Sequence, residues 1–154
     1  MSPINALGGV LAAGALATVA FDAFGQSLSP LFGYPRLAPV GLANGLLKAL
    51  TGAGSNAMAE GMHYLIGLIG YPLGWILVAG PAHRAIAPGI PLLIAAALYG
   101  IALWAVALYV IGHLIVGNPP FLNFGPLSWV AFVGHIVYAV VFVASYRWIR
   151  AARW

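Results

Sequence analysis

The stretch IPLLIAAALYGIALWAVALYVIGHLIV, residues 90–116, decides the fold class. It contains no Asp, Glu, Lys or Arg, and it is longer than the roughly 20 apolar residues that a helix needs to cross a bilayer. A run of this kind predicts a transmembrane helix. Three more apolar segments, at about 4–28, 58–80 and 127–149, predict further spans, and stretches rich in Pro and Gly separate all four.

The composition agrees with a chain that lies in lipid. Of its 154 residues, 63% are hydrophobic and 5% are charged, whereas soluble domains carry about 25% charged residues. Nucleic-acid binding is not expected, because the basic balance rests on six cations against two acids. The absence of Cys excludes disulfides and thiolate metal sites. The sequence therefore predicts an all-α, polytopic membrane protein, a single domain over 1–154 with four transmembrane helices in an up-and-down bundle.

The cations predict an orientation. Four of the six fall on the side of the chain termini: Arg84, Arg147, Arg150 and Arg153. The other two, Arg36 and Lys48, lie in the first connection between spans. Since Lys and Arg accumulate in cytoplasmic loops, we expect a multi-pass protein of the bacterial inner membrane with both termini in the cytoplasm.

The first connection contains a short amphipathic stretch at about 39–50. Leu42, Leu46, Leu47 and Leu50 recur at helical spacing, with Lys48 to one side. One interpretation is a segment that lies at the membrane interface or folds back over the bundle. The alternative is an ordinary apolar loop that packs against neighbouring helices.

The second span has the small residues that allow close helix packing. Gly70 and Gly74 form a G-x-x-x-G pattern, and Gly67 extends it by one turn. His63 lies on the same face as these glycines. Pro72 lacks a backbone donor in the middle of the span, so we expect a kink there.

Ionisable residues occur inside the spans, where they are costly and face the bundle interior. In an up-and-down bundle they fall in one half of the membrane, the outer half under the predicted orientation. The polar cluster predicted from this convergence comprises Asp22, Gln26, Glu60, His63, His113, His135 and Tyr138. Within it, Glu60 and His63 have the Glu-x-x-His spacing of di-metal sites in helix bundles.

Three hypotheses follow for this cluster. One is a cofactor site, in which His63, His113 and His135 bind haem b, or these histidines with Glu60 bind a divalent metal. Another is a proton or small-solute path through the membrane. The third, which we favour, is structural: hydrogen bonds hold the helices of a non-enzymatic accessory or assembly subunit. Its expected partners are the lipid bilayer and other membrane subunits or further copies of the chain.

Enzymes that act on lipids or quinones are a further alternative. Asp22 with a histidine could serve as a general base, but the sequence contains no nucleophile motif or phosphate-binding glycine loop.

The layout resembles small uncharacterised four-span proteins of bacterial inner membranes. The residues that carry the resemblance are Glu60-x-x-His63-Tyr64-x-x-Gly67 and Gly134-His135-x-x-Tyr138. The resemblance implies a four-span fold and transfers no activity.

Overall fold

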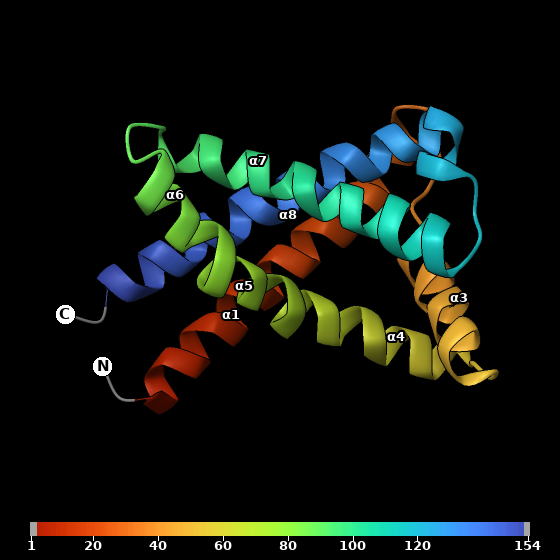
Figure 1. The fold of residues 1–154 in the computed structure, drawn as a ribbon, viewed down its shortest axis with the longest axis horizontal. Helices are drawn as coiled ribbons and strands as arrows, with labels where there is room; N and C mark the ends of the chain where they lie inside the picture. The colour runs from red at the N-terminus through yellow and green to blue at the C-terminus, as the bar shows by residue number, and fades with distance from the viewer. Residues whose placement is uncertain (1–2, 153–154) are drawn as a thin grey trace.

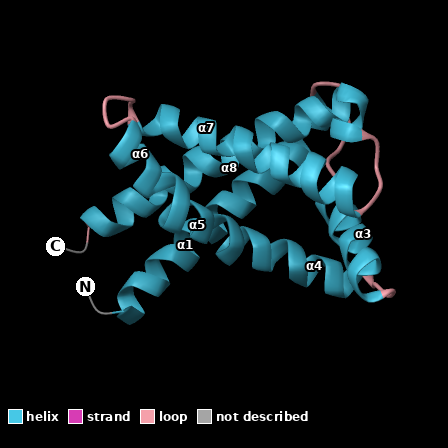
Figure 2. Cartoon of the chain, in the orientation of Figure 1, coloured by secondary structure: helices cyan, strands magenta, loops and turns pink. Residues whose placement is uncertain are grey.

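The computed structural model describes residues 3–152, and this part of the chain is helical with no strand (Figures 1 and 2). Four helices are long and apolar enough to cross a membrane: Ala6–Leu31, Asn56–Ile86, Leu92–Ile115 and Pro126–Ala151. The predicted all-α architecture with four membrane-spanning helices is therefore confirmed, and the chain has the features of a multi-pass membrane protein.

Each span is one continuous helix, in which α-helical turns alternate with wider π turns in all but the last. The first span comprises α1 (Pro3–Asp22), η1 (Ala23–Leu28) and α2 (Ser29–Leu31), and the second comprises α4 (Asn56–Leu65), η2 (Ile66–Gly70), α5 (Tyr71–Gly74), η3 (Trp75–Ala79) and α6 (Gly80–Ile86). The third comprises α7 (Leu92–Ala105) and η4 (Val106–Ile115), and the fourth is α8 (Pro126–Ala151). Two short helices, α3 (Pro39–Thr51) and η5 (Pro120–Phe124), lie in the connections.

The second span continues six residues beyond the end that the sequence predicted. Gly80 and Pro81 suggested a break, but the helix runs on to Ile86. Pro81 stands in the first turn of α6, directly after the π turns of η3. The Gly80 amide donates to the carbonyl of Trp75, five residues back, and wider turns of this kind accommodate the donor that Pro81 lacks.

Helix α8 is the centre of the bundle, because it packs along both α1 and α7. Helix α1 in turn packs against η2 of the second span. The second and third spans meet at the short loop 87–91 and diverge away from it (Figure 1). Helix α3 lies at the wide end and packs against α4 and η4. The segment predicted at 39–50 is therefore a helix that covers the gap between two spans.

Glycines allow a close approach at two helix crossings. A Cβ at Gly14 would lie 2.9 Å from the carbonyl oxygen of Leu68 on the second span, and one at Gly100 would lie 2.6 Å from the carbonyl oxygen of His135 on α8. Real Cβ atoms do not approach backbone so closely, so at these points only glycine permits the observed distance between helices.

The predicted packing residues of the second span divide into two groups. Gly67 lies against the Thr18 side chain of α1, Gly74 lies against the Tyr99 hydroxyl of α7, and Pro72 is buried. Gly70 is exposed, and a Cβ there would meet only Ile66 of its own helix. The prediction for Gly70 is wrong because it lies on the outer side of the helix.

At Pro72, where the sequence predicts a kink, the helix changes its hydrogen-bond pattern. Pro72 stands in the short segment α5, between the π segments η2 and η3. Just before it, the Tyr71 amide donates to the carbonyl of Ile66, five residues back. Wider turns of this kind accommodate the missing proline donor and are frequent at functional sites.

The connection before α8 has an unusual backbone. Phe121, Leu122, Asn123 and Phe124 all have positive φ, between 48° and 56°, which costs non-glycine residues roughly 1–2 kcal/mol each. Aromatic packing offsets this strain, since the Phe121 ring lies 4.6 Å from the Trp104 ring, centroid to centroid.

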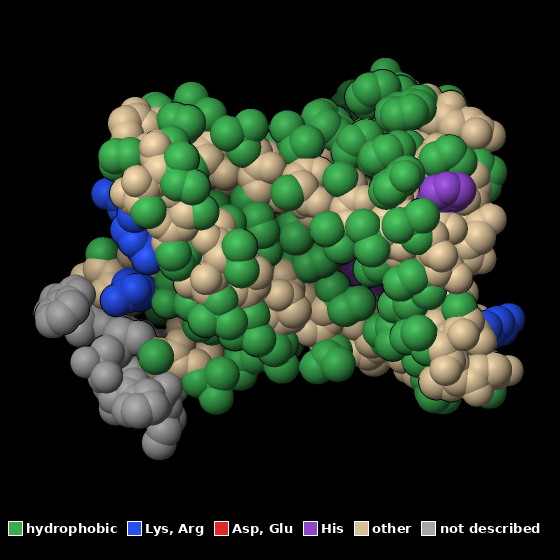
Figure 3. Space-filling view, viewed as in Figure 1, with side chains coloured by type: hydrophobic (Ala, Val, Ile, Leu, Met, Phe, Trp, Pro, Cys, Tyr) green, Lys and Arg blue, Asp and Glu red, His purple; other side chains and the backbone are tan. Residues whose placement is uncertain are grey.

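Both termini of the described chain lie at the same end as loop 87–91 (Figure 1). We call this end of the bundle the arginine end, because Arg84, Arg147 and Arg150 lie there (Figure 3). Arg36 and Lys48 precede the second span and so lie at the opposite end. Arg153, which the orientation argument also counts, falls outside the described residues. The assignment of the arginine end to the cytoplasm stays a prediction.

Candidate functional site

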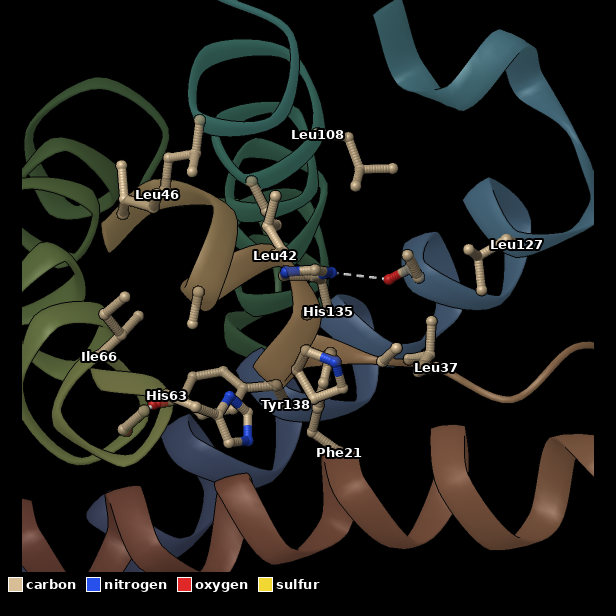
Figure 4. Close-up of a pocket in the computed structure, with 18 of the residues that line it drawn as sticks. Phe21, Leu37, Leu42, Leu46, His63, Ile66, Leu108, Leu127, His135 and Tyr138 are labelled. Carbon is tan, nitrogen blue, oxygen red and sulfur yellow. Dashed lines mark hydrogen bonds between the residues drawn. The ribbon is translucent and has the colours of Figure 1, made fainter. Parts of the chain in front are cut away.

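A cavity of about 400 Å³ lies inside the wide end of the bundle, beneath α3 (Figure 4). Side chains from all four spans and from α3 line it, and most of them are apolar. Its size falls in the range of about 300–1,000 Å³ that is typical of small-molecule sites. The apolar walls include Phe21, Leu37, Leu42, Leu46, Ile66, Leu108 and Leu127, and the polar residues that line the cavity are Thr18, His63, Tyr71, Asn118, His135 and Tyr138.

His63 is held by a carboxylate on the neighbouring span. Its Nε2 atom lies 3.1 and 3.3 Å from the two carboxylate oxygens of Asp22. The Gln26 amide donates to the same Asp22 carboxylate at 3.0 Å. The side chains of His63 and Asp22 are only 14% and 22% exposed, so the pair links the first and second spans in a partly buried setting.

His135 is positioned by its own helix and by the second span. Its Nδ1 atom lies 2.7 Å from the carbonyl oxygen of Ala131, and the Tyr71 hydroxyl lies 3.4 Å from its Nε2 atom. The Phe21 ring separates the two histidines, with its centroid 5.1 Å from that of His135 and 6.2 Å from that of His63. His135 is 5% exposed, so the environment of its ring is set almost entirely by protein.

Two hydroxyl groups at the cavity donate to backbone carbonyls. Tyr138 on α8 donates to the carbonyl of Gly67 on the second span at 2.5 Å. Thr18 donates to the carbonyl of Gly14, one turn earlier in its own helix, at 2.8 Å. These bonds fix the walls of the cavity, and they leave the oxygens of both hydroxyls able to accept but without a hydrogen to donate.

The imidazoles also present acceptors. A carboxylate and a carbonyl accept hydrogen bonds only, so Nε2 of His63 carries its hydrogen toward Asp22 and Nδ1 of His135 carries its hydrogen toward Ala131. In the neutral rings, Nδ1 of His63 and Nε2 of His135 are then acceptors, and Nε2 of His135 receives the hydroxyl hydrogen of Tyr71. Among the lining residues that the structure describes, only the side-chain amide of Asn118 offers both a free hydrogen-bond donor and an acceptor.

Two members of the predicted cluster lie elsewhere. Glu60 is exposed on α4, and Nδ1 of His113 lies 2.7 Å from the carbonyl oxygen of Asn118, where it ties the end of the third span to the following turn. Glu60 lies one turn before His63, and its side chain is exposed whereas that of His63 is half-buried.

The structure consequently does not assemble the predicted seven-residue cluster. Within residues 3–152 it brings together no group of three or more His, Asp or Glu that could hold a metal ion. The proposed metal ligands Glu60, His63, His113 and His135 are therefore not one group. It does bring Asp22, Gln26 and His63 into contact, and it places His63, His135 and Tyr138 around one cavity.

Neither Tyr71 nor Tyr99 belongs to the cluster predicted from the sequence. The Tyr99 hydroxyl donates to the Tyr71 carbonyl at 2.5 Å, and the Tyr71 hydroxyl faces His135. A signal for Tyr71 was present, because His63, Gly67 and Tyr71 follow one another at intervals of four and share a helix face. Tyr99 offered no such signal, since its partner is a backbone atom on another span.

Comparisons with protein-family models, with curated proteins and with solved structures found no match to this chain. The resemblance to four-span inner-membrane proteins therefore stays a prediction.

Proposed function

We propose that this chain is a membrane protein that binds a small lipophilic molecule in the cavity beneath α3. The observation that supports the proposal is a cavity of about 400 Å³ with mostly apolar walls and a few polar groups that converge from different spans. Binding sites for small molecules have this character. A molecule dissolved in the bilayer would bring its apolar body against residues such as Leu42, Leu46 and Leu108.

The hydrogen-bonding pattern narrows the class of ligand. The hydroxyl hydrogens of Thr18, Tyr71 and Tyr138 are used within the protein. The open acceptors are therefore these hydroxyl oxygens and Nδ1 of the neutral His63 ring. A ligand head that only accepts, such as an ether or a ketone, would leave those acceptors unpaired, which is costly in a buried site. A head that donates, such as an alcohol or a phenol, would satisfy one of them. We therefore propose a lipophilic alcohol or phenol.

Farnesol and farnesyl methyl ether provide a matched pair of probes, because they share one apolar chain and differ in the donor. A ligand that binds only the folded state stabilises it by about 2.7 kcal/mol at a hundred times its Kd. We expect farnesol to raise the unfolding temperature of the protein in mild detergent and the ether to have a much smaller effect. Equal effects of the two probes would contradict the proposed role of the donor.

A substitution in the cavity wall distinguishes farnesol binding in the cavity from farnesol binding to the outer surface. Ala107 lines the cavity, whereas Leu77 is 67% exposed on the outside of the second span. Ala107→Leu narrows the cavity and should weaken stabilisation by farnesol, while Leu77→Ala should leave it unchanged. Retention of the full farnesol effect in Ala107→Leu would overturn the proposal.

The accessory-subunit, cofactor and transport hypotheses stay predictions. Copurification of a defined membrane partner would support the first. For haem, His135 has one favourable feature, since histidines that ligate metals donate their other ring nitrogen to a carbonyl or a carboxylate. A Soret band that disappears in His135→Ala would favour haem over a lipophilic alcohol.

A further inference from the structure

A second recess, which we call the arginine notch, lies at the arginine end, far from α3 along the spans. It has a volume of about 470 Å³ and shares no lining residue with the cavity. Its walls come from the second half of the second span, the first turn of α7 and the last turns of α8. They include Trp75, His83, Arg84, Tyr146, Arg147 and Arg150.

Three guanidinium groups thus line one recess from two helices, Arg84 from α6 and Arg147 and Arg150 from α8. Figure 3 shows Lys and Arg side chains gathered at this end of the molecule. The chain contains only two acidic residues. Asp22 pairs with His63, and Glu60 lies on α4 at the other end of the second span. The described residues therefore supply no carboxylate to this recess, and its like charges repel one another.

The contacts that hold the walls of the arginine notch in place leave the N–H donors of its arginines available. The His83 side chain bonds to the carbonyl oxygen of Ile90 at 2.8 Å and so ties α6 to the loop before α7. The Trp75 ring packs edge-on against Tyr99 at 5.5 Å between centroids. The Arg150 guanidinium lies over the Tyr146 ring, 5.7 Å from its centroid, a cation–π contact that leaves its N–H donors available.

We propose that the arginine notch binds the phosphate headgroup of an anionic phospholipid. Arginine donates pairs of parallel hydrogen bonds to phosphate oxygens, and basic pockets between transmembrane helices are typical sites for anionic lipid heads. Leu92 and Val143 add apolar wall to the recess, which suits the glycerol and acyl chains that follow the phosphate. The proposal is independent of the ligand in the cavity.

Native mass spectrometry of the intact protein in mild detergent tests the proposal. Phosphatidylglycerol and phosphatidylcholine with identical acyl chains are titrated separately. We expect phosphatidylglycerol to bind and the zwitterionic lipid to bind far more weakly. The paired variant R84Q/R147Q should weaken phosphatidylglycerol binding about 25-fold, since each arginine near an anionic lipid surface contributes about a fivefold effect.

The variant R36Q/K48Q is the matched control, because it also removes two cations but at the opposite end of the bundle. It should retain phosphatidylglycerol binding. Equal losses in the two variants, equal binding of the two lipids, or displacement of the lipid by inorganic phosphate at the same concentration would each overturn the proposal. A salt titration of the unmodified protein provides a test that needs no variant. Because salt screens charges, 0.5 M NaCl should weaken phosphatidylglycerol binding several-fold. Binding that does not respond to salt would also contradict it.

Discussion

Asp22→Asn changes the carboxylate that bonds to His63 into a neutral amide of the same size. Hydrogen bonds to charged groups contribute about 1.5–3 kcal/mol. The Asp22 and His63 side chains are 22% and 14% exposed. Because hydrogen bonds between transmembrane helices contribute about 1–2 kcal/mol, we expect a loss of about 1–2 kcal/mol. The loss should appear in the free energy of unfolding, measured by tryptophan fluorescence in mixed micelles with increasing SDS.

Glu60→Gln is the control for this prediction, because it makes the same chemical change at an exposed position on the second span. We expect it to change the free energy of unfolding by less than about 0.5 kcal/mol. In a His63→Leu background, Asp22→Asn should lose most of its effect, and the coupling energy of the double-mutant cycle should be about 1–2 kcal/mol. The assignment of this pair would be refuted if Asp22→Asn lowered the free energy of unfolding equally in the His63→Leu background, or if Glu60→Gln lowered it as much as Asp22→Asn.

Three further predictions use the same unfolding assay. Gly100→Ala should destabilise the protein by about 1–3 kcal/mol because its methyl group meets the α8 backbone, whereas Gly70→Ala, at an exposed helical position, should be neutral or slightly stabilising; equal costs would contradict the helix crossing. Ser128→Ala should raise the free energy of unfolding by about 1 kcal/mol, because the buried Ser128 hydroxyl has no hydrogen-bond partner, and a clear loss would reveal a missed partner. Asn123→Gly should stabilise the left-handed turn by up to about 1 kcal/mol and Asn123→Val should destabilise it; the reverse order would rule out this backbone.

The fold was predictable because hydropathy alone identifies membrane spans. With 5% charged residues, the sequence contains four long apolar segments. Inside lipid, only helices or closed barrels satisfy the hydrogen bonds of the backbone. The end of the second span was not predictable in the same way. Pro81 stops a helix in most contexts, and its tolerance here depends on the π turns of η3, for which the sequence shows no local signal.

The site was predictable in part. The helical spacing of polar residues placed Asp22 and His63 on inward faces, and the structure joins them. Glu60 was predicted to face inward in the same way, but it is exposed. The presence of a residue in a span does not determine which side of the helix it occupies. The position of α3 over the gap between the second and third spans could not be predicted either. The sequence shows that this segment is amphipathic but not what it packs against. The cavity depends on that placement, so no motif could have predicted it.

Photolabelling shows where in the bundle a lipophilic alcohol binds. The probe is an analogue of farnesol that carries a diazirine in its chain, and the labelled residues are identified by peptide mass spectrometry. We predict labelling of cavity residues such as Leu42, Leu108 and Ala131 that excess farnesol suppresses and Ala107→Leu weakens. Labelling confined to outward residues such as Leu77 and Val78, unaffected by excess farnesol, would contradict binding inside the bundle.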